Sequence, residues 1–372
     1  MIEWGDIYKV VEAMLPLYTA LGLGYGSVRW WRIFSPEQCE AINKLVSTFT
    51  LPLFTFEFTL HIDPFAMNYP FVAADAISKV VIVAMLAAWA KCTSKGSYCW
   101  SITNFSLSTL TNTLVVGVPM LRAMYGPLAQ DLVVQSSIVQ AIVWLSLLLF
   151  VLEWRKTGSD SGRETAAAVA CSDAHVVCVD AAAAVSLEKV ADGSHAAEPS
   201  AKADMARPPF WVIMRVVWLK LALNPNSYAS IVGITWAFLA NRWHFGMPGI
   251  MEGSILIMSK AGTGMAMFSM GLFMANQEKL ISCGPSLMAY GMVLRFIAGP
   301  AAMTLGCMAV GLHGDVLRVA IIQAALPQSI TSFIFAREYG LHADVLSTAV
   351  IFGMLISLPV LIAYYAVLEF LH

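Results

Sequence analysis

Segments of about 20 mostly apolar residues recur along nearly the whole chain, and a helix of that length spans the hydrocarbon core of a bilayer. Windows of this size predict helices at ten places in the sequence. Their ranges are 7–28, 38–59, 69–91, 98–121, 130–153, 211–241, 248–277, 281–311, 315–338 and 343–370. The sequence therefore predicts an all-α integral membrane protein with ten transmembrane helices.

The overall composition agrees with a membrane environment. Apolar residues make up 58% of the chain and charged residues 12%, with a mean hydropathy of +0.70. A soluble domain has about a quarter of its residues charged. So small a polar surface excludes a soluble enzyme, a nucleic-acid binder and a disordered regulator. The seven cysteines are scattered through apolar stretches and do not indicate a disulfide framework.

The predicted helices fall into two groups of five around a polar interval. We expect residues 1–153 to form a first five-helix repeat, 154–207 a short loop and 208–372 a second five-helix repeat. Because each group has an odd number of helices, the second enters the membrane from the opposite side, as in inverted-repeat transporters. The distribution of Lys and Arg predicts a cytosolic loop. Its richness in Ala, Ser, Asp and Glu predicts a flexible tether.

Two predicted helices contain helix-breaking residues at matching positions of the two repeats. Thr111, Gly117 and Pro119 predict a break in the fourth helix, and Pro327 predicts one in the ninth. A helix broken in mid-membrane exposes the N–H groups of its second half, and these attract an anion. Two such breaks, in matching positions of inverted halves, therefore indicate a transport site. Asn112 is then a natural donor to a carboxylate.

Charged residues at membrane depth need a partner or a function, since each costs about 2.5–3.5 kcal/mol on insertion scales. Asp75 and Lys79 lie four residues apart on one face of the third predicted helix. They form either a purely structural ion pair or a charge cluster behind the substrate site, and we favour the cluster. Arg295 is expected to serve mainly in structural pairing. No phosphate loop, zinc motif or haem signature occurs in the sequence, so no cofactor, metal or catalysis is expected.

Seven short motifs occur across both membrane halves. They are Phe34–Asn43, Leu51–Leu53, Thr111–Thr113, Asn224–Tyr228, Ala324–Ser329, Phe333–Tyr339 and Val350–Met354. With these motifs the chain resembles the plant PIN auxin efflux carriers. The short central interval resembles the short-loop branch of that family, especially its members in the endoplasmic reticulum.

This resemblance implies an elevator-type carrier for indole-3-acetate and related auxin anions, assembled as a homodimer in membrane lipid, with no nucleic-acid partner. It implies that helices one, two, six and seven form a scaffold and the other six a moving transport domain. It also implies that the broken helices four and nine cross and hold the substrate. The residues to which it gives roles are Asn112 for the carboxylate, Gln328 at the second crossover, Leu51 against the indole, Asn226 and Leu145 in the pocket, and Asp75 and Lys79 as a support site. Thr111 stands where the family commonly has Pro, and Leu145 where many members have Tyr.

The sequence and the resemblance favour the same mechanism. No cluster of carboxylates suits sodium, so we expect uncoupled movement of the auxin anion from the cytosol into the lumen of the endoplasmic reticulum. The location depends on loop length and family likeness. One alternative is a proton- or sodium-coupled organic-anion symporter of similar fold, with Asp75 as a coupling residue. The other is a membrane receptor that binds a small acid without moving it.

Overall fold

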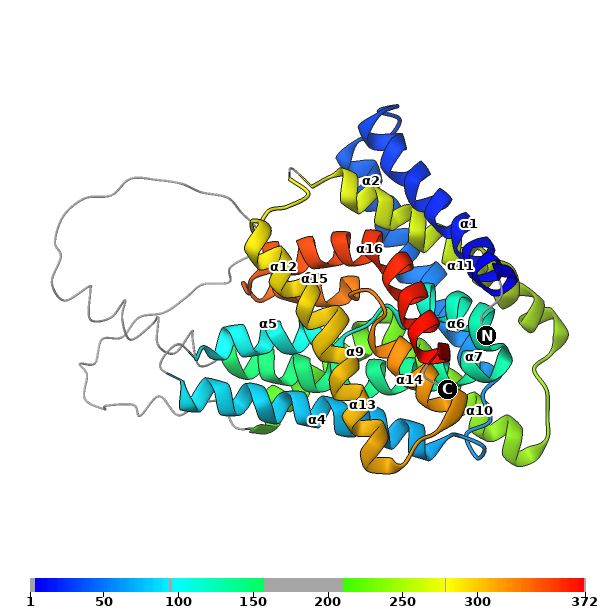
Figure 1. The fold of residues 1–372 in the computed structure, drawn as a ribbon. Coiled ribbons are helices and arrows are strands. Elements are labelled where there is room, and N and C mark those ends of the chain that lie inside the picture. The colour runs from blue at the N-terminus through cyan, green and yellow to red at the C-terminus, as the bar shows by residue number, and fades with distance from the viewer. Residues whose placement is uncertain (1–3, 94–95, 157–209, 278, 371–372) are drawn as a thin grey trace, which may run out of the picture. The chain divides into compact units, whose positions relative to one another are not determined.

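The computed structural model describes residues 4–93, 96–156, 210–277 and 279–370, and every regular element within them is a helix (Figure 1). One compact unit comprises Met1–Leu149 together with Leu219–His372, so that segments from both predicted repeats pack into it. A second unit comprises Phe150–Trp218. Most of the loop predicted as a flexible tether, residues 157–209, lies outside the described residues.

The helices before the loop follow the predicted ranges closely. They are α1 (Trp4–Arg29), α2 (Pro36–Leu45), η1 (Val46–Thr50), α3 (Leu51–Leu60), α4 (Tyr69–Cys92), α5 (Tyr98–Thr109), η2 (Thr113–Gly117), α6 (Val118–Tyr125), α7 (Pro127–Val139) and η3 (Gln140–Trp144). The elements η1, η2 and η3 are single π-helical turns that continue directly into the next helix. Pro127–Lys156 is therefore one continuous helix that contains α7 and η3.

The helices after the loop are equally close to expectation. They are α9 (Phe210–Leu223), α10 (Pro225–Trp243), α11 (Gly249–Ala275), α12 (Pro285–Val293), η4 (Leu294–Ala298), α13 (Gly299–Val310), α14 (Gly314–Ala324), α15 (Ile330–Glu338) and α16 (Ala343–Phe370). The predicted range 211–241 contains two helices, α9 and α10, which are divided at Asn224. Pro225 begins α10 there, and the Asn224 side chain accepts a hydrogen bond from the N–H of Asn226.

Five helices in the described part of the chain are long and apolar enough to cross a membrane. They are Tyr69–Cys92, Pro127–Lys156, Gly249–Ala275, Pro285–Val310 and Ala343–Phe370. The apolar helix Thr113–Tyr125 is shorter because the chain is interrupted before it. The remaining predicted ranges contain helices that fall short of this length or apolarity. The protein is thus an all-α integral membrane protein.

Local sequence explains where several helices begin. Ser35 and Gln38 form a capping box, in which the Ser35 side chain accepts from the N–H of Gln38 and the Gln38 side chain accepts from the N–H of Ser35. Pro36 occupies the first turn of α2, where no N–H is needed. Asn68 caps α4 by accepting from the N–H of Phe71 at 3.0 Å.

Glycines bring α1 and α11 into direct backbone contact. A Cβ atom on Gly24 would lie 2.1 Å from the carbonyl oxygen of Phe268, and one on Gly271 would lie 2.1 Å from that of Leu21. Small residues at such positions let helices approach closely in a membrane, where apolar burial alone does not drive their association. The α1–α11 packing therefore depends on the absence of a side chain at both positions.

We expect Gly271→Val to lower the melting temperature of the purified protein in detergent, because α1 and α11 must separate to admit the side chain. Overpacking of this kind costs about 1–3 kcal/mol of unfolding free energy. Gly264→Val is the matched control, since Gly264 lies on the same helix and a Cβ atom added to it would have no other atom within 4 Å. Equal melting temperatures for the two variants would contradict the close-contact interpretation.

Candidate functional site

The two interrupted helices cross and exchange backbone hydrogen bonds at their breaks. The N–H of Asn112 donates to the carbonyl of Pro327 at 2.8 Å, and the N–H of Ser329 donates to the carbonyl of Leu110 at 3.1 Å. These two bonds form an isolated antiparallel bridge between the short extended segments that follow α5 and α14. Segments more than 200 residues apart in the sequence are thereby held together inside the helical bundle.

The first break is shorter than the sequence predicted. It covers residues 110–112, so Gly117 and Pro119 lie within the helix that follows rather than in the break. The π-helical turn η2 ends two residues before Pro119, which lies in the first turn of α6, and it accommodates a residue that lacks an N–H. Gly117 allows the second break to approach, because a Cβ atom there would lie 2.6 Å from Cδ1 of Leu326.

The N-terminal end of η2 presents free hydrogen-bond donors. Among the described residues, the N–H groups of residues 113–116 have no acceptor. Asn112 precedes them, is only partly buried, and makes no capping bond with its side chain. By contrast, the start of α15 is capped by Ser329, whose hydroxyl accepts from the N–H of Thr331 at 3.4 Å. Of the two helix starts at the crossing, that of η2 is therefore the less capped.

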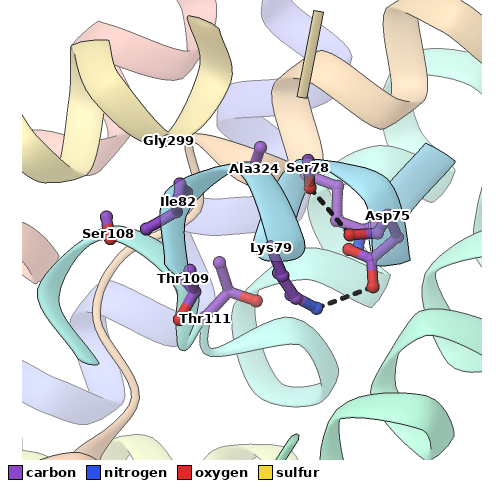
Figure 2. A pocket seen from close by; sticks show the side chains of 10 residues that line it. Asp75, Ser78, Lys79, Ile82, Ser108, Thr109, Thr111, Gly299 and Ala324 are labelled. Carbon is purple, nitrogen blue, oxygen red and sulfur yellow. Dashed lines mark hydrogen bonds and ion pairs between the residues drawn. The ribbon is translucent and has the colours of Figure 1, made fainter. Parts of the chain in front are cut away.

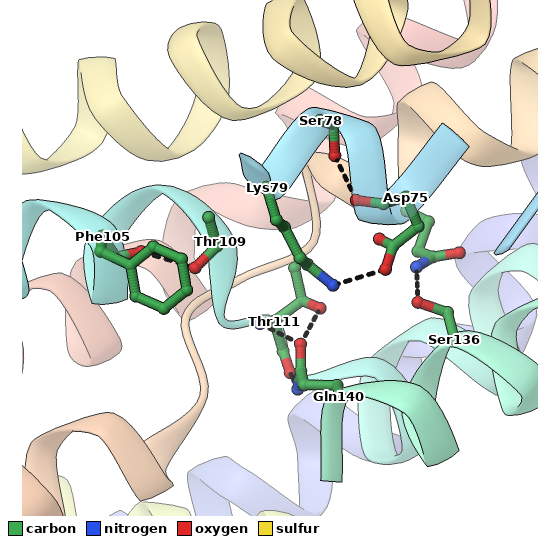
Figure 3. A network of polar contacts seen from close by, with 9 residues as sticks. Asp75, Ser78, Lys79, Phe105, Thr109, Thr111, Ser136 and Gln140 are labelled. Carbon is green, nitrogen blue, oxygen red and sulfur yellow. Dashed lines mark hydrogen bonds and ion pairs between the residues drawn. The ribbon is translucent and has the colours of Figure 1, made fainter. Parts of the chain in front are cut away.

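Thr111 is held by the side chain of Gln140 on the neighbouring helix (Figure 3). The Oε1 atom of Gln140 accepts from the backbone N–H of Thr111 and from its hydroxyl, each at 3.1 Å. The Nε2 atom of Gln140 donates to the carbonyl of Thr111 at 2.8 Å. All polar groups of Thr111 are thus bonded to one amide.

Gln328 lies inside the crossing and has no exposed surface. Its Nε2 atom donates to the carbonyl of Ser106 at 2.8 Å and to the hydroxyl of Ser332 at 2.7 Å. Its Oε1 atom has no partner among the described residues. This amide therefore connects α5 to α15 and strengthens the crossing from within.

Asp75 and Lys79 form a buried ion pair beside the crossing, with 2.7 Å between Oδ2 and Nζ (Figure 2). The two residues are 5% and 4% exposed, which is consistent with full pairing in a dry site. They line a cavity of about 20 Å³ together with Thr111 and Gln323, room for a single water molecule. The Nζ atom of Lys79 also lies 5.3 Å from the centre of the Trp144 ring.

Arg295 on η4 binds the carbonyl ends of both interrupted helices. Its guanidinium donates to the carbonyls of Leu107 and Leu110 at 3.2 Å each, near the end of α5, and to that of Ala324 at 2.8 Å, at the end of α14. The residue is 1% exposed, and no carboxylate lies within 4.0 Å of it in the described chain. Helix C-termini carry partial negative charge, so they stabilise this buried cation in place of an acid.

The remaining expected pocket residues lie on neighbouring elements. Asn226 is the second residue of α10 and accepts from the hydroxyl of Thr55 on α3 at 2.5 Å. Leu51 is the first residue of α3 and is partly buried. Leu145 is buried and directly follows η3, the turn that carries Gln140. The crossing itself therefore gathers Asn112, Thr111, Pro327 and Gln328, with Asp75 and Lys79 beside it.

Sequence reasoning missed several residues that support the site. They are Gln140 and Trp144 on η3, Ser136 on α7, Gln323 on α14, and the role of Arg295 on the helix ends. Gln323 donates to the hydroxyl of Ser136 and so joins α14 to α7. Each is a polar or amphipathic side chain within an apolar helix, which was the available signal. Nothing in the sequence indicated their partners.

An all-helical membrane protein with crossed interrupted helices and a buried polar centre has the features of a transporter. A family model described as "Membrane transport protein" matches residues 9–365. Auxin efflux carrier component 5 of Arabidopsis thaliana is 66% identical over 372 residues, which cover both chains completely. Probable auxin efflux carrier component 5a of Oryza sativa subsp. japonica is 65% identical, again over the whole of both chains.

A third relative has a longer chain than this protein. Auxin efflux carrier component 4 of Arabidopsis thaliana is 30% identical over an alignment of 614 residues, which covers 99% of this chain and all of the relative. The chain belongs to the membrane transport protein family and, within it, to the short members of the PIN-type auxin efflux carriers. It is a transporter and not an enzyme.

We expect Arg295→Met to lower the melting temperature strongly, since each buried carbonyl left without its donor costs about 1–3 kcal/mol. Arg295→Lys keeps the positive charge but loses the several N–H donors of the guanidinium. We expect its melting temperature to lie between those of Arg295→Met and the wild type. Arg337→Met, at an exposed arginine near the end of α15, is the control. A melting temperature unchanged by Arg295→Met would show that the helix ends do not depend on this residue.

Proposed function

We propose that this protein carries the indole-3-acetate anion across a membrane by an uncoupled elevator mechanism. The observation that supports this most directly is the open N-terminal end of η2, where four backbone N–H groups without acceptors in the described chain follow the partly buried Asn112. Such an end binds a carboxylate without a permanent counter-charge. The names of the relatives point to auxin as the anion.

The charges around the crossing support binding of one anion. Each helix C-terminus carries about half a negative charge, so the ends of α5 and α14 together offset the single positive charge of Arg295. Asp75 and Lys79 neutralise one another. The remaining charge is the partial positive end of η2, which suits a monovalent carboxylate and does not require sodium or another cation to balance it.

In this mechanism the residues have distinct tasks. Asn112 and the N–H groups of η2 bind the carboxylate, while Gln328 holds the second crossover in place. Leu51 packs on the indole from the scaffold, and Asn226 and Leu145 complete the pocket wall. The ion pair of Asp75 and Lys79 supports the crossing from behind.

The larger architecture belongs to the same proposal. Ten transmembrane helices form two inverted repeats, 1–153 and 208–372, joined by a short cytosolic loop at 154–207. Helices one, two, six and seven form the scaffold of a homodimer in lipid, and the other six carry the substrate. The short loop is the feature that supports a location in the endoplasmic reticulum, where the carrier moves auxin from the cytosol into the lumen.

Uptake of radiolabelled indole-3-acetate into vesicles that contain the purified protein tests the transport proposal. We expect saturable uptake in the wild type and at least about a tenfold loss of affinity in Asn112→Ala, since a hydrogen bond to a charged group contributes about 1.5–3 kcal/mol. Asn276→Ala, at an exposed asparagine that ends α11, is the matched control. Saturable binding without uptake would instead identify a receptor.

Asp75→Asn tests the main competing mechanism, a proton-coupled symporter, which the buried carboxylate beside a cavity favours. In the uncoupled mechanism Asp75 is structural. Uptake by the variant is then reduced through loss of the ion pair, with Lys79 left buried and unpaired. We expect neither the remaining uptake of Asp75→Asn nor the uptake of the wild type to change when the proton gradient is removed. Uptake that stops in wild-type vesicles when the proton gradient is removed would establish coupling and refute the proposal.

A further inference from the structure

We infer that Gln140 is a positioning residue, which holds Asn112 in its binding orientation through the three hydrogen bonds that it makes to Thr111. The inference rests on the proposed function, because it takes Asn112 as the donor to the carboxylate. It concerns a residue that does not touch the substrate itself.

The bridge between the two breaks leaves Thr111 with unused backbone groups. The bonds of the bridge come from Asn112 and Leu110 on one side and from Pro327 and Ser329 on the other. In this arrangement the N–H and carbonyl of Thr111 point away from the opposite segment, like those of an edge strand. Buried backbone groups of this kind need partners elsewhere.

The amide of Gln140 supplies those partners in the manner of a third strand. It accepts from the N–H of Thr111 and donates to the carbonyl of Thr111, as a neighbouring peptide group would. Thr111 is 5% exposed and Gln140 is 7% exposed, so water does not compete freely for these bonds. The segment that carries Asn112 is thereby fixed on both edges, by the second break and by η3 (Figure 3).

The arrangement follows from having threonine at position 111. Threonine brings a backbone N–H and a hydroxyl, and both donate to Gln140. A proline at 111 would bring neither donor and would stiffen the backbone by its ring. The preceding residue, Leu110, has φ −82° and ψ 110°, the extended conformation that a residue before proline favours. Thr111→Pro therefore suits the conformation of Leu110 and removes two of the three groups that Gln140 satisfies, leaving only the carbonyl of residue 111.

This relation defines a double-mutant experiment on uptake of indole-3-acetate by the full chain in vesicles. Gln140→Leu strands the N–H and carbonyl of Thr111, and we expect KM to rise about tenfold with little change in maximal rate. Thr111→Pro combined with Gln140→Leu leaves only the carbonyl of residue 111 stranded, so we expect its KM to lie between those of Gln140→Leu and the wild type, since coupled residues are non-additive. Gln135→Leu, at an equally buried glutamine on the same helix that bonds to Asn68, is the control.

The melting temperature of each variant separates positioning from folding. If Gln140→Leu folds poorly, Thr111→Val replaces it, because it removes only the hydroxyl bond and is expected to raise KM about twofold. A Gln140→Leu variant with the KM of the wild type would overturn the inference, and so would a double variant no better than Gln140→Leu. Absence of saturable uptake in the wild type would refute the proposed function itself, and the two failures are therefore distinguishable.

Discussion

The structure depends on one constraint, which is that two helices interrupted inside an apolar bundle must find partners for every backbone group they free. Four groups pair with each other across the two breaks, at Asn112, Pro327, Ser329 and Leu110. Side chains from other helices satisfy several more. Arg295 donates to carbonyls at the ends of α5 and α14. The side-chain amide of Gln140 on η3 bonds to the backbone N–H and the carbonyl of Thr111. Unpaired buried groups of this kind are costly in a membrane.

What this pairing leaves open defines the site. The carbonyls at the ends of α5 and α14 accept hydrogen bonds from Arg295. At the start of α15, the hydroxyl of Ser329 accepts from the N–H of Thr331. The start of η2, by contrast, has no side-chain cap and retains free N–H groups in the described chain. An anion meets partial positive charge there and no fixed full charge, which permits both binding and release. A permanent cation at that place would retain the substrate, whereas Arg295 is already offset by the helix ends it binds.

Much of this could be predicted from the sequence because its signals are local. Apolar segments of spanning length located the helices, and the residues Pro327 and Thr111 marked both breaks. The spacing of Asp75 and Lys79 placed both side chains on one face of a helix, and in the structure they pair at 2.7 Å. These features depend on helix periodicity and on backbone chemistry, which can be read within a few residues of sequence.

The rest could not be predicted because it depends on contacts between distant segments. Gln140 and Thr111 are 29 residues apart, and Arg295 reaches Leu107 across 188 residues. No spacing rule connects such pairs. The extent of the first break was also misjudged, since a π-helical turn lets Pro119 remain inside a helix. Sequence identified residues that needed partners, but only the fold shows which partners they have.

The central claim is that the crossing binds and moves an anion alone, and the charge carried per molecule of auxin tests it most directly. Vesicles adsorbed on a solid-supported membrane can be exposed to a step in indole-3-acetate concentration with equal pH and equal sodium on both sides. Uncoupled transport predicts a current that corresponds to one negative charge moving with each auxin molecule. Labelled auxin entering these vesicles faster than it enters protein-free vesicles, but without any current, would show co-transport with a cation and would contradict the account.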